Sequence, residues 1–304
     1  MSKSETRASC VTFSFDNTAV YADVFEPEVQ AWLQSDLLEK YPDGQVYLAT
    51  NLSNARSVIK QLLIPRYKAI FVIGSDASFE RFINTYRELS PNPAACVPIG
   101  FVPLKMSQFS GDFGLSIPAS RMNSLDEMSF STTNMCLPEL NSHLALRIHA
   151  GRRLSLLSYI PQSIGKRFMH TPLTKPLSGM TLATCLNEST YACELYGQNF
   201  LGHALAKDQI IFNKRILTLT VRPTRLEPPS ADGSCRYFIL DVESLSTSPR
   251  FLPTLSPTTD AYLCQRIKLE FSPSLQLDTP SSSLEASSVT ITLSNRSIAC
   301  LVPR

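Results

Sequence analysis

Hydrophobic positions in the first 120 residues alternate between strand-like runs and helix-like stripes. The β-rich run at 11–15 is followed by apolar residues at helical spacing over 29–41, and Pro42-Asp43-Gly44 ends this stripe. A short apolar strand pattern at 45–49 and a helical stripe at 54–63 repeat the arrangement. The pattern therefore predicts two consecutive strand–helix units.

A third unit follows the same order. Residues 69–73 form a continuous apolar run, which is typical of a strand covered on both faces, and 79–86 carry another helical stripe before a fourth strand at 97–102. Alternation of this kind predicts a doubly wound, mostly parallel sheet, whose ligands bind beyond the carboxyl ends of the strands. Thr50 and Gly74 stand at two such ends.

The pattern changes near residue 131, where helical periodicity gives way to β-rich runs between Pro-, Ser- and Thr-rich stretches. We expect a nucleotide-binding-like α/β domain over 1–130 and a lipid- or substrate-binding-like β-sandwich over 131–304. Whether the last strand returns to the first domain is left open. The expected strands of the second half lie at 154–160, 180–186, 216–221, 237–242, 266–271, 289–293 and 298–302.

Composition fits a globular chain. Of the 304 residues, 43% are hydrophobic and 18% charged, which excludes a disordered tail and a coiled coil. The eight cysteines show neither a Cys-x-x-Cys pair nor zinc spacing, so we expect reduced thiols. No apolar run reaches the roughly 18 residues that span a bilayer, and the opening MSKSETRASC is polar. We expect a soluble, cytoplasmic protein.

Charge is distributed unevenly. The net charge is +2, but residues 1–130 carry −3 and residues 131–304 carry +5. A basic second half could contact an anionic membrane or phosphates, and a solvated surface explains it equally well. Basic and aromatic residues do not interleave as they do in nucleic-acid-binding segments, so we expect no nucleic-acid partner. The oligomeric state is not predicted.

The most informative stretch is the turn Gly74-Ser75-Asp76-Ala77-Ser78 between a buried strand and a helix. Small residues let backbone N–H groups approach an anion, and the helix directs the positive end of its dipole toward it. Such a turn can hold phosphate, and Asp76 could orient Mg²⁺ or a reacting hydroxyl. The alternative is that Asp76 only caps the helix that starts near Ser78.

This turn resembles the Gly-Gly-Asp-Gly-Thr of the diacylglycerol-kinase-type lipid kinases. Thr50 followed by Asn54-Ala55-Arg56 is similar to the family's threonine and the helix after it, and 98–104 is similar to its Pro-x-Gly-x-x-Pro-Leu. The resemblance implies ATP-dependent phosphorylation of a lipid hydroxyl with Mg²⁺. It makes Asp76 the catalytic candidate and Asp260 the metal candidate. The nucleotide-binding candidates are Thr50, Gly74, Ser75, Asp76, Ala77, Ser78 and Lys105.

The chain departs from the family at the positions that carry chemistry. Ser75 and Ala77 replace glycines, and a left-handed Ala77 would cost about 1–2 kcal/mol. Lys105-Met106 stands where the family has Gly-Thr, and Thr279-Pro280 follows Asp278 where a glutamate base would stand. Several simultaneous losses predict weak or absent turnover. The alternative is a rewired site in which the Lys105 ammonium supplies charge near the phosphates.

Other functions remain open beside a lipid kinase. A relative that has lost catalysis could still bind lipid or nucleotide as a regulator, or serve as a scaffold for protein partners. NAD kinases share the Gly-Gly-Asp-Gly-Thr turn, and Asn187-Glu188 is superficially similar to their Asn-Glu motif. That pair lies too far from Asp76 in the sequence, so the lipid-kinase resemblance fits better. Peripheral contact with an anionic membrane is a further expectation of the resemblance.

Overall fold

The computed structural model describes residues 11–33, 45–64, 67–90, 97–105, 107–117, 119–120, 122, 127–151, 192–198, 204–211, 215–224, 238–245, 257–264 and 266–304. The chain divides into two compact units. Described residues 11–136 and 295–304 belong to the first unit, and those within 137–224 and 238–294 belong to the second.

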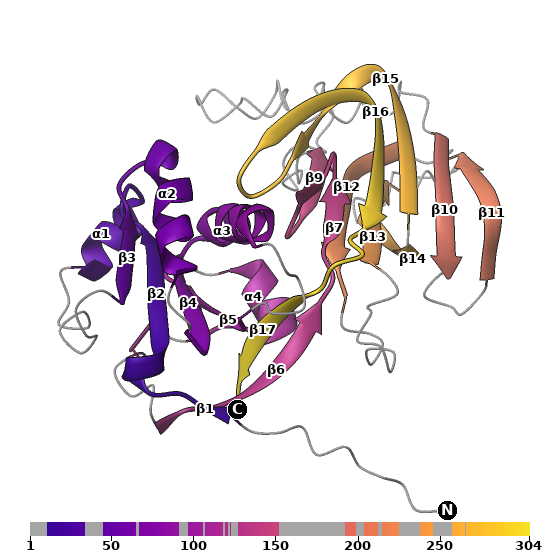
Figure 1. Ribbon diagram of the computed structural model, residues 1–304. Coiled ribbons are helices and arrows are strands. Elements are labelled where there is room, and N and C mark those ends of the chain that lie inside the picture. Colours follow the sequence, from indigo (N-terminus) through magenta and orange to yellow (C-terminus); the bar gives the residue numbers. More distant parts are fainter. Residues whose placement is uncertain are drawn as a thin grey trace, which may run out of the picture. The chain divides into compact units, whose positions relative to one another are not determined.

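The first unit is built on a seven-stranded mixed sheet in the order β1-β6-β17-β5-β4-β2-β3 (Figure 1). Four neighbouring strands run parallel, and β17 joins β5 in the same direction. Strands β6 and β1 pair antiparallel at the other edge. This arrangement confirms the expected α/β class. The strands are β1 (Val11–Thr12), β2 (Thr18–Asp23), β3 (Val46–Ala49), β4 (Ala69–Gly74), β5 (Ile99–Pro103), β6 (Ser129–Met135) and β17 (Ile298–Pro303).

Helices pack on both faces of this sheet. Successive side chains of a strand point to opposite faces, so one strand can contact helices on both sides. On β2, Val20 and Ala22 pack into a cluster that contains Trp32 of α1. The Tyr21 ring points to the other face, where its centroid lies 4.9 Å from that of Phe82 on α3. The helices are the 3₁₀ turn η1 (Phe15–Asn17), α1 (Pro27–Leu33), α2 (Leu52–Leu62), α3 (Asp76–Leu89) and α4 (Gln108–Phe113).

The first predicted strand was misplaced. The expected strand at 11–15 is reduced to the two-residue β1, which pairs with β6. The parallel strand is instead β2, whose six residues are all buried between β3 and β4. Its sequence, TAVYAD, mixes small and polar residues and therefore lacks the apolar run that marked β4.

The second unit is an antiparallel β-domain, as the change of pattern near residue 131 predicted. Its ten strands form the path β14-β13-β12-β9-β15-β16-β7-β8, with β10 pairing both β15 and β11. The expected strands at 154–160 and 180–186 lie outside the described residues. The strands are β7 (Pro138–Leu140), β8 (His143–Leu144), β9 (Ile148–Gly151), β10 (Ala192–Gln198), β11 (Ala204–Ile211), β12 (Arg215–Pro223), β13 (Phe238–Leu245), β14 (Pro257–Cys264), β15 (Arg266–Asp278) and β16 (Ser283–Leu293).

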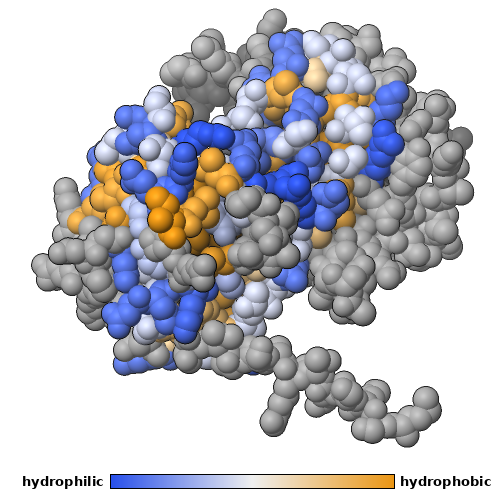
Figure 2. Space-filling model, viewed as in Figure 1, coloured by the Kyte–Doolittle hydropathy of each residue, from blue (hydrophilic) through white to orange (hydrophobic). Residues whose placement is uncertain are grey.

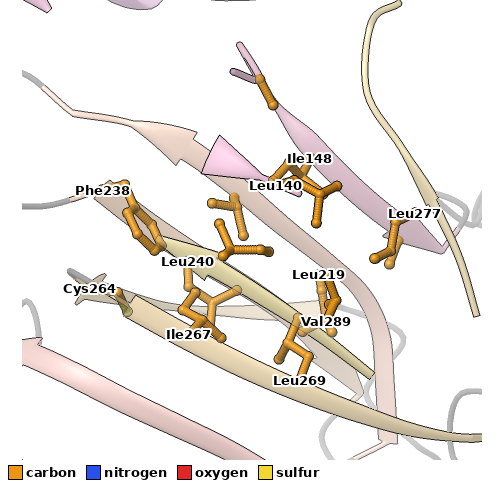
Figure 3. Packing of buried hydrophobic residues seen from close by; sticks show 14 of the residues in the cluster. Leu140, Ile148, Leu219, Phe238, Leu240, Cys264, Ile267, Leu269, Leu277 and Val289 are labelled. Carbon is orange, nitrogen blue, oxygen red and sulfur yellow. The ribbon is translucent and has the colours of Figure 1, made fainter. Parts of the chain in front are cut away.

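Buried hydrophobic residues from several strands form a cluster inside this second unit. Leu219 of β12, Leu240 of β13 and Ile267 of β15 are buried members of this cluster (Figure 3). A cluster that draws on many strands gives the β-domain a core of its own. Among the described residues of both units, no helix is long and apolar enough to cross a membrane.

Candidate functional site

The candidate site lies where the parallel strands of the first unit end. Asp23 of β2 is in register with Ala49 of β3, and Gly74 of β4 is in register with Pro103 of β5. Because β2 and β4 are also neighbours, all four carboxyl ends meet at one edge of the sheet. This is the edge at which open α/β sheets bind ligands.

The turn after β4 is held by glycine at its entrance and by serine at the helix start. Gly74 has φ +149°, and a Cβ there would lie 2.9 Å from Ser78 Oγ, so this position requires glycine. Ser75 is the N-cap of α3, and its Oγ accepts a hydrogen bond from the Ser78 N–H. Asp76 is thus the first helical residue rather than the cap. Ala77 is helical, so the left-handed strain considered for it does not arise.

Asp76, the catalytic candidate, is engaged within the chain. Its Oδ1 accepts a hydrogen bond of 2.5 Å from Ser107 Oγ. Ser107 is also the N-cap of α4, and its Oγ accepts from the Ser110 N–H at 2.9 Å. Asp76 therefore ties the start of α3 to the start of α4.

A carboxylate lies on the donors of the turn. Glu26 Oε2 accepts from the Ser75 N–H at 3.2 Å, and Glu26 Oε1 accepts from Ser75 Oγ at 2.9 Å. Glu26 Oε1 also lies 2.8 Å from Arg81 Nη2 in an ion pair. The carboxylate of Glu26 thus occupies both the backbone N–H and the hydroxyl of Ser75.

A second carboxylate anchors the same arginine. Asp23 Oδ2 accepts from Arg81 Nη2 at 2.8 Å and from Ser78 Oγ at 2.9 Å, while Asp23 Oδ1 accepts from the Tyr21 hydroxyl at 2.6 Å. The Asp23 side chain is only 1% exposed. Every oxygen of this buried carboxylate is therefore hydrogen-bonded, as burial of a charge requires.

Arg81 binds both acids, and its charge is secure. Burial alone would lower the pKa of Arg81, but the hydrogen bonds and charges of Asp23 and Glu26 outweigh it and raise that pKa. The pKa of Tyr21 is also raised, first by burial and then by the Asp23 carboxylate. One guanidinium facing two carboxylates leaves the cluster with a formal charge of −1. A site of this sign repels phosphate.

The other nucleotide-binding candidates stand at the same edge, with partners of their own. The exposed Thr50 accepts through Oγ1 from Asn54 Nδ2 at 2.7 Å. Lys105 is 64% exposed and forms an ion pair with Glu28. That contact is the main reason why the pKa of Glu28 lies below its ordinary value. The Lys105 ammonium is thus paired with an acid, and Met106 lies outside the described residues.

The remaining candidates belong to the second unit. Asp260 lies on β14, opposite Val242 of β13. Asp278 ends β15, and hydrogen bonds from Ser283 and Gln276 lower its pKa. Pro280 lies in the turn that leads to β16. Among the residues that the structure describes, no three His, Cys, Asp or Glu side chains group as metal ligands would.

The residues present do not fit a nucleotide with Mg²⁺ in this arrangement. The Ser75 donors face Glu26, Asp76 accepts from Ser107, and the charge at the turn is negative. The sequence analysis missed the three residues that cause this, Asp23, Glu26 and Arg81. One sequence signal was available. Proline is favoured in the first turn of a helix, so Pro27 indicates a helix start and places Glu26 directly before that helix.

Comparison with known proteins supports the fold. The sequence matches no family model and no curated protein. The structure is similar to that of a diacylglycerol kinase from Bacillus anthracis strain Sterne, with a TM-score of 0.51 at 12% identity over 93% of this chain and 96% of that chain. Two further structures from the same strain, whose diacylglycerol kinase assignment is provisional, give TM-scores of 0.54 and 0.53 at 11% and 10% identity with the same coverage. The expected lipid-kinase-type fold is therefore confirmed.

Proposed function

We propose that this chain is a lipid-kinase-like protein in which ATP-dependent phosphorylation of a lipid hydroxyl is weak or lost. We propose further that it acts by binding to an anionic lipid surface. The observation that carries the proposal is the Glu26 carboxylate on the Ser75 donors. Phosphoryl transfer depends on positioned donors and Mg²⁺ that neutralise developing negative charge. A resident carboxylate at the turn opposes both requirements.

Turnover is the direct test. The natural chain is incubated with ATP, Mg²⁺ and diacylglycerol in mixed micelles, and the phosphorylated lipid is measured against a reaction without protein. We expect product at that background or only slightly above it. A second reaction with NAD in place of lipid covers the NAD-kinase alternative. Turnover near the roughly 1–100 s⁻¹ of ordinary kinases with either acceptor would refute the proposed loss of catalysis.

Binding to an anionic lipid surface is the favoured non-catalytic role. Two large hydrophobic side chains are exposed near the ends of α2: Leu52, its first residue, at 63%, and Ile64, which follows its C-cap Leu63, at 78%. Helix α2 carries two basic residues, Arg56 and Lys60, and no acidic one, so its own charge is positive although residues 1–130 carry −3 overall. In the space-filling view, hydrophobic and hydrophilic patches share the surface of the first unit (Figure 2). Exposed apolar side chains at a helix that also carries basic residues suit a membrane interface.

Vesicle co-sedimentation tests this role. The natural chain should sediment with vesicles of phosphatidylserine and phosphatidylcholine more than with phosphatidylcholine alone, and added salt should reduce the difference. Replacing Leu52 and Ile64 together by serine should lower recovery, whereas Gln61→Ser on the same helix should not. Equal recovery with both vesicle types at every salt concentration would contradict the electrostatic part of the argument.

A further inference from the structure

We infer that Glu26 is an internal blocker of the turn at Ser75, an autoinhibitory contact that keeps anions such as nucleotide phosphates away from it. The inference rests on the proposed function and names the group that closes the site. It starts from the mismatch between a fold shared with diacylglycerol kinase structures and a turn whose donors are already engaged.

The contact has the geometry of an anion bound at a helix start. Ser75 gives Glu26 a backbone N–H and a hydroxyl, and Arg81 adds a guanidinium N–H at 2.8 Å. Backbone N–H, hydroxyl and guanidinium groups are the donors that proteins use for phosphate oxygens. A phosphate approaching the same donors would meet a negative charge within hydrogen-bonding distance of each of them.

The backbone of Glu26 is held independently of its carboxylate. Glu26 directly precedes α1, and its carbonyl accepts from the N–H groups of Val29 and Gln30 at 3.0 and 3.1 Å. Its side chain is 13% exposed, whereas that of Asp23 is 1% exposed. A change of side-chain rotamer could therefore withdraw the Glu26 carboxylate while Asp23 keeps Arg81 in place. The opened turn would then present the Ser75 donors beside an Arg81–Asp23 pair of zero net charge.

A purely structural role would have a different signature. A carboxylate at a helix N-terminus also stabilises the helix. If that were all Glu26 does, its loss would lower stability and leave anion binding unchanged. If Glu26 instead blocks the turn, removing its carboxylate should strengthen anion binding.

The test compares nucleotide binding by the full chain and its variants. Dissociation constants for ATP with Mg²⁺ are measured by calorimetry for the natural chain, Glu26→Ala and Glu26→Gln. The control is Glu88→Gln, which removes a carboxylate of the same charge from the exposed pair with Arg56. We expect binding at least tenfold tighter for Glu26→Ala than for the natural chain, a smaller gain for Glu26→Gln, and no gain for the control.

Three results would overturn the inference: equal binding by the natural chain and Glu26→Ala, no binding by either, or an equal gain in the control. A measurement on the natural chain keeps the inference testable if both Glu26 variants fail to fold. Hydrogen exchange of the Ser75 amide should be slow, because Glu26 accepts its hydrogen bond, and unprotected exchange would overturn the contact. Lipid turnover tests the proposed loss of catalysis, whereas the ratio of dissociation constants tests whether Glu26 blocks the turn. Failure of one claim can therefore be told apart from failure of the other.

Discussion

Replacing Arg81 by methionine should strongly destabilise the first unit. The guanidinium donates to Asp23 from Nε at 3.3 Å and from Nη2 at 2.8 Å, and it also pairs with Glu26. Methionine keeps an apolar stem of similar length to the aliphatic part of arginine and removes the charge and the donors. Asp23 would then remain buried with only two hydroxyl donors, and the like charge of Glu26 would be uncompensated.

The expected magnitude follows from burial. Removing one partner of a buried ion pair costs about 3–5 kcal/mol, because the other charge is left uncompensated. The Arg81 side chain is 25% exposed, so water can reach the vacated space, and we expect a value near the lower end, about 3 kcal/mol. Arg56 offers a matched control on α2, since it and Glu88 are 60% and 59% exposed. Arg56→Met should cost about 0–1 kcal/mol.

Urea unfolding followed by tryptophan fluorescence is the assay. Trp32 is the single tryptophan of the chain and lies buried in the core of the first unit, so its emission reports that unit. With a slope of about 1–3 kcal/mol/M, a loss of ~3 kcal/mol moves the midpoint down by about 1–3 M. The reasoning is refuted if the midpoints of Arg81→Met and Arg56→Met agree within error.

Three further changes test other parts of the site and the β-domain. Gly74→Ala should lower the free energy of unfolding by more than about 1 kcal/mol, because φ is +149° and the new Cβ would meet Ser78 Oγ at 2.9 Å; a Trp-monitored loss below ~0.5 kcal/mol would contradict this. Tyr21→Phe removes a hydroxyl donor from a buried carboxylate and should cost about 1.5–3 kcal/mol in the same assay, and no change in midpoint would argue against the hydrogen bond. The pKa of Asp278 is lowered on folding, so its contribution is present above its unfolded pKa of about 3.9 and lost as the pH falls through the folded value. Asp278→Asn should therefore remove part of the acid destabilisation below about pH 4, measured by circular dichroism, and identical acid profiles would refute that linkage.

The sequence predicted the scaffold well because strong periodicity reports burial directly. The apolar run of β4 and the stripes that became α2 and α3 are long enough for one period to dominate. The antiparallel second unit was foreseen from the loss of that periodicity. Strand β2 was missed because a central strand can be buried through small and polar residues when neighbours satisfy them, as Tyr21 and Asp23 do here.

The chemistry of the site was less predictable, because it depends on residues that meet only in the folded chain. The motif comparison located the turn at Gly74–Ser78, but the groups that fill it come from the end of β2 and from the second turn of α3. Glu26 and Arg81 are 55 residues apart, and no local pattern links them. Their pairing follows only once β2 is placed beside β4.

The position of β17 has a consequence for how the protein is made. Strand β17 lies between β5 and β6, yet β6 ends at Met135 and β17 begins at Ile298, so 162 residues lie between these neighbours in order of synthesis. At about 5–20 residues per second, the ribosome needs roughly 8–33 s to bridge that interval. During this time the edges of β5 and β6 that β17 will cover stay unpaired. Unpaired strand edges can pair with other chains. A nascent chain of this protein therefore offers chaperones a defined window in which to act, which closes when residues 298–303 leave the exit tunnel and complete the sheet.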